Sequence, residues 1–118
     1  MKRLLYEFAC AVLVLGLAGV ASAANKTMTG SISDSMCGAS HAKMIAAHPQ
    51  AHMTDRDCAL ACVKAGAKYV FVSSGKVYQI ANQDFAALQK DAGETVHLTG
   101  DVNGDTITVK KLAMAKRQ

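Results

Sequence analysis

Apolar and polar residues alternate most regularly in the last third of the chain. Residues 95–102 and 105–109 both follow this period of two, which is typical of strands with one buried face. Asn103-Gly104 separates the two runs, and this pair favours a type I′ hairpin turn because both central residues need positive φ. The pattern predicts a hairpin, with a β-bulge where Lys110-Lys111 disturbs the alternation.

Earlier segments predict three further strands, over residues 27–33, 68–72 and 76–80. The second and third of these flank Ser73-Ser74-Gly75. A short turn containing glycine between two β-rich runs predicts another hairpin.

Three segments predict short helices, namely residues 40–48, 54–65 and 83–91. The first is rich in alanine and stops at Pro49. The second begins at Thr54, an N-cap residue with Asp57 three positions on, and ends at Gly66. The third follows Asn82, which is a suitable N-cap residue.

The resulting order is strand, two-helix insert, strand, strand, helix, strand, strand. Without the insert, which covers about residues 36–66, this is the order of an OB-type barrel, whose helix lies between strands three and four. The predicted fold is therefore mainly β, an OB-like five-stranded barrel with a cysteine-bearing two-helix insert between strands 1 and 2. An α+β sandwich is the alternative.

The N-terminus has the composition of a secretory signal peptide. Lys2 and Arg3 precede an apolar run over residues 8–20, and Ala21-Ser22-Ala23 supplies the small residues for cleavage before Ala24. The run is short against the roughly 20 residues of a membrane-spanning helix. We expect an exported protein, periplasmic or extracellular, with residues 1–23 removed and no membrane span afterwards.

The remaining residues 24–118 suffice for one small domain. Their net charge is +3, from 11 basic and 8 acidic residues. This mild excess, with no evident basic groove, argues against nucleic acid as a partner.

Cysteine, histidine and methionine side chains, which are potential ligands of soft metal ions, are concentrated between residues 36 and 62. The cysteines expected in the exported chain are Cys37, Cys58 and Cys62. They are accompanied by His41, His48, His52, Met36, Met44 and Met53. Because three is an odd number, one disulfide leaves the third cysteine as a free thiol, a metal ligand or an intermolecular link.

A structural disulfide is the first interpretation of this cluster. Cys37 closes a loop of about 20 residues with either partner, worth about 3 kcal/mol in the chain-entropy model. If the two short helices are antiparallel, Cys62 is the nearer partner and Cys58 remains free. The helix dipole then lowers the pKa of the Cys58 thiol, while Asp55 and Asp57 oppose that effect.

A metal site is the second interpretation. Cys37, His41, Cys58 and Cys62 supply three sulfur donors and one nitrogen donor, a set that suits tetrahedral zinc. Thiolate, thioether and imidazole together suit copper(I). The remaining candidate ligands are His48, His52 and Met44.

Thiol chemistry and a barrel-face ligand are weaker interpretations. A cysteine nucleophile needs a histidine base and an orienting group, and no family signature supports that geometry around Cys58. OB-type barrels bind oligomeric ligands through strands two and three, where Tyr69, Phe71 and Tyr78 lie. Aromatic residues at alternate strand positions are more often part of the core.

Three stretches carry a resemblance to a known family: residues 30–38 (GSISDSMCG), 58–70 (CALACVKAGAKYV) and 98–107 (LTGDVNGDTI). They resemble a family of small secreted bacterial proteins of unknown function. The resemblance covers nearly all of the exported chain, and the two cysteine-bearing stretches are its most specific parts. It implies an exported domain like a small β-barrel with a C-x20-C-x3-C pattern, and it implies no activity.

The sequence thus predicts a non-enzymatic, exported binding or structural domain, with a disulfide-stabilised insert and a free thiol. Its expected partner is an envelope protein, a peptide or a glycan. The alternatives are a periplasmic copper- or zinc-binding protein and a thiol-based redox protein or cysteine-dependent enzyme.

Overall fold

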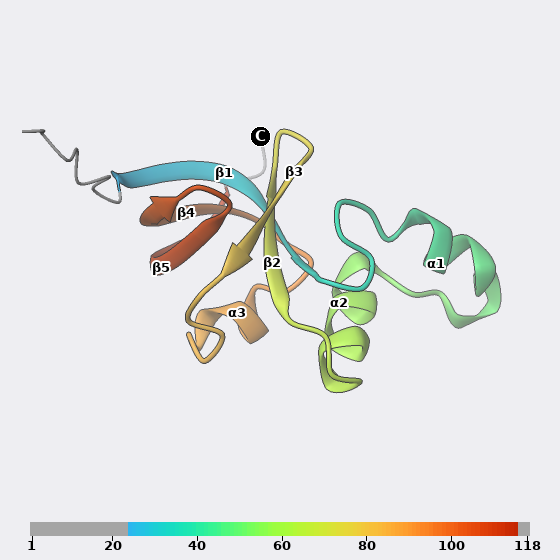
Figure 1. The fold of residues 1–118 in the computed structure, drawn as a ribbon. Helices are drawn as coiled ribbons and strands as arrows, with labels where there is room; N and C mark the ends of the chain where they lie inside the picture. Colours follow the sequence, from blue (N-terminus) through green and yellow to red (C-terminus); the bar gives the residue numbers. More distant parts are fainter. Residues whose placement is uncertain (1–23, 116–118) are drawn as a thin grey trace, which may run out of the picture.

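Five strands close into a barrel in the order β1–β2–β3–β5–β4 (Figure 1). The structure is a computed structural model and describes residues 24–115. Its strands are β1 (Ala24–Asp34), β2 (Tyr69–Ser73), β3 (Lys76–Ile80), β4 (Thr95–Asn103) and β5 (Thr106–Met114). Its helices are α1 (Ala42–Ala47), the 3-10 turn η1 (Pro49–Ala51), α2 (Asp55–Lys64) and α3 (Ala87–Lys90).

Strand pairing confirms the OB-like barrel, and the alternative sandwich is not formed. β1 pairs with β2 through its last residues and with β4 through most of its length. The contact of β3 with β5 is parallel, unlike the other four, and includes Gln79↔Thr106. That short parallel contact closes the barrel.

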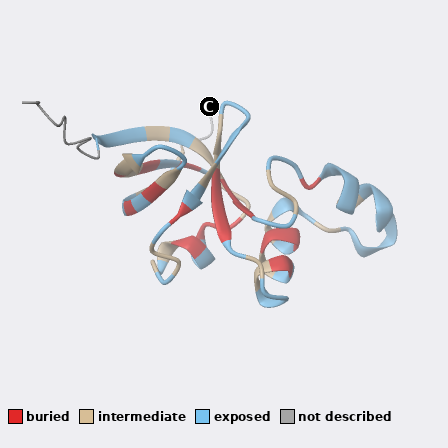
Figure 2. Cartoon of the chain, viewed as in Figure 1, coloured by how far each residue is buried: buried red, intermediate tan, exposed pale blue. Residues whose placement is uncertain are grey.

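Alternate side chains of the strands point into one apolar core, as the period of two requires. The largest fully buried apolar side chains are Phe71, Ile32, Leu88, Leu98, Ile107 and Val96. Figure 2 shows buried positions on the strands, on α3 and on α2, where the buried residues are Cys58, Ala59 and Cys62. Gly30 permits the close approach of β1 and β2, since an added Cβ would lie 2.2 Å from the Val72 carbonyl oxygen.

The β4–β5 hairpin confirms the predicted bulge and corrects the predicted turn. Thr99 pairs with Lys111 but Gly100 pairs with Val109, so the ladder skips Lys110. The turn begins one residue later than predicted, because Asn103 still pairs with Thr106. Gly104 is now the first central residue and has a φ of 60°, whereas neither Asn103 nor Asp105 is among the residues of positive φ. Positive φ at the first central residue alone is the type II′ pattern.

The helix predicted over residues 83–91 is wrong in its extent. Only α3 is helical there, and Asn82 does not cap it. The Asn82 side chain instead bonds to β5, accepting from the Val109 N–H at 2.8 Å and donating to the Val109 carbonyl at 2.8 Å. A tertiary contact that mimics a strand pair therefore outweighs the local capping preference.

The helical insert lies at one end of the barrel, with α2 between the barrel and α1 (Figure 1). Thr54 and Asp57 form the predicted capping box at the start of α2. The first turn of α2 meets the barrel at Gly93, where an added Cβ would lie 2.3 Å from the Arg56 backbone nitrogen. The Arg56 guanidinium donates to the Lys90 carbonyl, which fixes the helix against the segment before β4.

The predicted signal peptide lies outside the described residues, as do residues 116–118. Within residues 24–115, no helix has the length and apolar character needed to cross a membrane.

Candidate metal centre

A turn at the end of β1 brings the first site residues together. Asp34 is the last residue of the strand and is fully buried. Its Oδ2 accepts hydrogen bonds from the backbone N–H groups of Met36 (3.0 Å) and Cys37 (2.9 Å). Gly38, with a φ of 62°, donates its N–H to the Asp34 carbonyl oxygen at 2.9 Å. An aspartate that bonds to its own downstream backbone stabilises such a turn, and here it holds Cys37 beside the carboxylate.

His41 lies between two carboxylates at the N-terminus of α1. Its Nε2 is 2.5 Å from Asp34 Oδ1, and its Nδ1 is 3.2 Å from Asp55 Oδ1. The imidazole is 5% exposed, whereas the Asp55 side chain is 63% exposed. The ring is therefore oriented by one buried acidic group and one acidic group in contact with solvent.

The Asp34 carboxylate is held in its charged form. Burial by itself raises the pKa of this carboxyl group, but the hydrogen bonds from His41 and from the Cys37 backbone outweigh that effect. The net result is a pKa below the usual range, with the positive charge of His41 contributing in the same direction. A carboxylate that stays ionised inside the protein is suited to a cation.

Donor atoms of Asp34, Cys37 and His41 form one compact group. A carboxylate oxygen, the Cys37 Sγ and an imidazole nitrogen all lie within 4.8 Å of one another. All three residues belong to one short stretch at the exit of β1. Oxygen, sulfur and nitrogen donors at such separations form a candidate metal site.

The other two cysteines approach this group from α2. Cys58 is 0% exposed and Cys62 is 9% exposed, while Cys37 is partly accessible. Burial, the negative charge of Asp34 and the neighbouring Cys37 raise the pKa of the Cys62 thiol to about 12. Burial, with Cys37 and Asp55 next in effect, also raises the pKa of Cys58. Both thiols on α2 are therefore protonated at neutral pH.

Of the two opposing effects expected at Cys58, the one from Asp55 and Asp57 has the observed direction, and burial is the largest cause of the raised pKa. Within the described residues, all three cysteines are free thiols. The Cys37–Cys62 disulfide is not formed and its pairing remains a prediction. The partly accessible thiol is Cys37, whereas Cys58, the residue that the sequence predicts as the free thiol, is buried.

The structure does not bring the remaining predicted ligands to this group. Met44, His48 and His52 are exposed on α1 and on the turn around η1. Figure 2 shows that α1 presents an exposed surface and buries none of its residues. The metal-ligand candidates from the sequence thus separate into two groups. One lies between the turn after β1 and α2, and the other is exposed on α1 and around η1.

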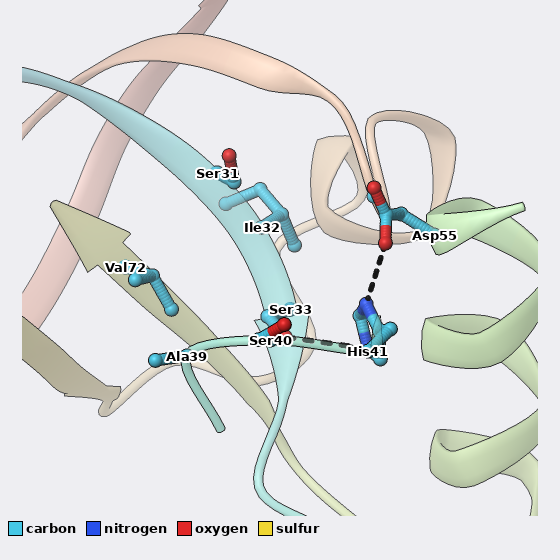
Figure 3. A pocket seen from close by; sticks show the side chains of 9 residues that line it. Ser31, Ile32, Ser33, Ala39, Ser40, His41, Asp55 and Val72 are labelled. Atoms are coloured by element: carbon cyan, nitrogen blue, oxygen red, sulfur yellow. Dashed lines mark hydrogen bonds and ion pairs between the residues drawn. The ribbon is translucent and has the colours of Figure 1, made fainter. Parts of the chain in front are cut away.

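A polar cavity of about 170 Å³ adjoins His41 on the Asp55 side (Figure 3). Ser33, His41 and Asp55 line it in the order of a serine hydrolase triad, with Ser33 Oγ 3.4 Å from His41 Nε2. However, Asp34 lies closer to that nitrogen, and the Ser33 hydroxyl donates to the Gly38 carbonyl at 2.8 Å. Because the imidazole has no free nitrogen facing the hydroxyl, Ser33 is not activated as a nucleophile.

The predicted aromatic ligand face does not exist as a surface. Phe71 is fully buried and Tyr69 is 8% exposed, so both belong to the barrel core. Tyr78 is half-buried, packs against Phe71 and lies under the Lys76 ammonium, 4.8 Å from it. Stacking a ligand on Phe71 would require opening the barrel.

Asp34 and Asp55 are site residues that the sequence pattern alone does not identify. Asp34 lies in one of the stretches that carry the resemblance, and Asp55 stands in the sequence near Cys58. The available signal was an aspartate at a strand end, three residues before a cysteine, since such aspartates nucleate turns.

Comparisons of the chain with protein-family models, with curated proteins and with solved structures find no match in any of the three. The resemblance to a secreted family of unknown function therefore stays a prediction. The functional assignment has to come from the geometry around His41.

Proposed function

We propose that this protein binds a single transition-metal ion, with zinc as the best match, at Asp34, Cys37 and His41, and that Cys62 supplies the fourth ligand. The observation that carries the proposal is the approach of three donor atoms to within 4.8 Å of one another. A site with carboxylate, thiolate and imidazole donors fits zinc, which accepts all three.

The donor set distinguishes zinc from copper(I). Copper(I) prefers thiolate and thioether sulfur, whereas carboxylate oxygen is a harder ligand. The exposed methionines do not support copper, because Met36 is 65% exposed and Met44 is 39% exposed. The buried Asp34 beside the thiols therefore favours zinc.

Cys62 is preferred over Cys58 as the fourth ligand because of its direct neighbours. Hydrogen bonding with Cys37 and Asp34, in addition to their charge, contributes to the raised pKa of the Cys62 thiol. The same two groups affect the pKa of Cys58 only through their charge, and the Cys58 side chain is fully buried. Cys58 therefore serves as a matched control within the same helix.

Asp55 has the position of an outer carboxylate in such a site. A metal-ligating histidine usually donates its second ring N–H to a carboxylate, which fixes the ring orientation. Asp55 Oδ1 lies 3.2 Å from His41 Nδ1 and leaves Nε2 on the side of Asp34. Zinc would bind its sulfur ligands as thiolates, so binding releases protons.

Zinc titration of the purified, reduced protein against a chromophoric chelator tests the proposal. We expect one zinc per chain and cobalt substitution that gives the intense absorption of thiolate–metal charge transfer. Cys37→Ser, His41→Ala and Cys62→Ser abolish tight binding, and Asp55→Asn weakens it by about 10- to 100-fold as an outer ligand.

Cys58→Ser is the control and should bind zinc as the wild type does. Failure of the fully reduced wild type to bind zinc would refute the proposal. Loss of binding in Cys58→Ser with retention in Cys62→Ser would refute the assignment of the fourth ligand.

A further inference from the structure

We infer that Cys37 is a site of thiol–disulfide exchange and that it passes the resulting bond to Cys62, which forms an internal disulfide and blocks the metal site. The co-reactant is a low-molecular-weight disulfide. The blocking of metal rests on the proposed function, whereas the exchange itself does not.

Cys37 is the cysteine that reacts first, because it is the accessible one. Of the three cysteines described, Cys37 is the partly exposed one, and Cys58 and Cys62 are buried. Cys37 lies in the turn between Asp34 and Gly38, where side-chain and backbone hydrogen bonds hold its position. An external disulfide can therefore reach this sulfur first.

Proximity selects Cys62 as the second cysteine. The Cys62 carbonyl accepts a hydrogen bond from the Ala67 N–H at 3.0 Å, and the neighbouring Lys68 carbonyl accepts one from the Ser35 N–H at 2.8 Å. The end of α2 therefore lies against the turn that carries Cys37, and Cys37 accordingly contributes to the raised pKa of the Cys62 thiol. Cys58 and Cys62 are a helical turn apart on α2, so a bond between those two would not link the helix to the barrel. A Cys37–Cys62 bond would join the turn after β1 to α2.

The internal disulfide forms in two thiol–disulfide exchange steps. The Cys37 thiol loses its proton, and its sulfur attacks the external disulfide, which forms a mixed disulfide and expels one thiolate. The Cys62 thiol then loses its proton, and its sulfur attacks the Cys37 sulfur and expels the second thiolate. The two protons are taken up by the two leaving thiolates, so two cysteine thiols are oxidised and one external disulfide is reduced to two thiols.

Metal binding and this disulfide exclude each other. The oxidised form removes two of the four proposed donors, because a disulfide sulfur is no longer a thiolate ligand. Bound zinc conversely keeps both sulfurs engaged, and only the metal-free fraction can react. We expect an exported chain to reach an oxidising compartment. Bound metal would protect the two cysteines there from forming the disulfide.

Oxidised glutathione is the probe, applied to the reduced protein with and without zinc. In the metal-free protein we expect loss of two hydrogen atoms in the mass and a Cys37–Cys62 linkage in the peptide map. With zinc at about 100 times its dissociation constant, the rate should fall about 100-fold because only the metal-free fraction reacts. Cys58→Ser should behave as the wild type.

Variants separate the two steps. Cys62→Ser should stop with one glutathionyl group on Cys37, and Cys37→Ser should gain neither the adduct nor the internal bond. A Cys37–Cys58 linkage, or unchanged oxidation of Cys37→Ser, would overturn the inference.

The two proposals can also be told apart. If reduced protein binds no zinc but forms the Cys37–Cys62 bond, the proposed function fails and the exchange stands. If zinc binds and the oxidised protein still binds it fully, the mutual exclusion fails and the metal site stands.

Discussion

Different interactions stabilise the barrel and its helical insert. The barrel buries Phe71, Ile32 and Leu98 completely and closes through paired strands, with one bulge between β4 and β5. In the insert, α1 buries nothing and α2 buries Cys58, Ala59 and Cys62. The barrel is thus stabilised by apolar packing, to which Ala59 of α2 contributes, whereas the rest of the insert depends on caps, buried polar contacts and two thiols.

Most of the apolar core and the candidate metal site therefore lie in separate parts of the molecule. The site residues contribute little apolar area, and the carboxylates around His41 create a local environment that favours a cation. Substitutions in the two regions should therefore change different measurable properties.

The largest effect should come from Phe71→Ala in the barrel core. Removing a fully buried phenylalanine should lower the free energy of unfolding by about 3–5 kcal/mol, measured by urea denaturation. Val77→Ala, at a position 36% exposed, is the control and should change it by about 0.5 kcal/mol or less. Zinc stoichiometry of the folded variant should remain that of the wild type, and its loss would contradict the separation of the two regions.

A smaller effect is expected from Thr54→Ala at the start of α2. The variant loses a capping box and should be less stable by about 1 kcal/mol at neutral pH. Hydrogen bonds from the Thr54 backbone and hydroxyl hold the pKa of Asp57 below its usual value of 3.8. A lowered folded-state pKa gives stability above the unfolded-state pKa that is lost as the pH falls through the folded-state value.

The difference in stability between Thr54→Ala and wild type should therefore shrink as the pH falls below about 4. Thermal unfolding between neutral and acidic pH measures it, and Asp57→Asn should remove the same pH dependence. A difference that stays constant through the acidic range would show that the carboxylate plays no part in the cap.

The smallest effect is expected on the outer helix. Replacing Met44, His48 and His52 together by alanine should leave the zinc affinity unchanged and alter stability by about 0.5 kcal/mol or less, since all three are exposed. Chelator competition and thermal unfolding measure the two quantities. A clear loss of zinc affinity would show that α1 takes part in the site.

Much of the fold could be predicted because local and global preferences agree. The strand alternation, the Thr54 cap and the bulge at Lys110 each follow from a few adjacent residues. Asn82 was predicted wrongly because its side chain bonds to Val109, far along the chain. No local pattern contains that contact.

The sequence predicts the types of residue in the candidate site, but it does not predict which of the candidate residues come together. Cys37, His41 and Cys62 were recognised as soft donors, but the choice among nine cysteine, histidine and methionine residues depended on how the helices pack. Asp34 was missed because its role needs the turn that returns Cys37 to the strand end. The closeness of His41 to two carboxylates is likewise a product of tertiary structure.

The way in which the insert leaves and rejoins the barrel also bears on how such a protein can evolve. Asp34 and Tyr69 are paired neighbours, and Ser35 and Lys68 are joined by a backbone hydrogen bond of 2.8 Å. The two ends of the insert are therefore as close as the ends of an ordinary hairpin turn. A gene can exchange the segment between them for another of different length, provided that the new segment covers the part of the core where Ala59 packs. New chemistry can thus be acquired here by insertion, while the barrel retains its own folding information.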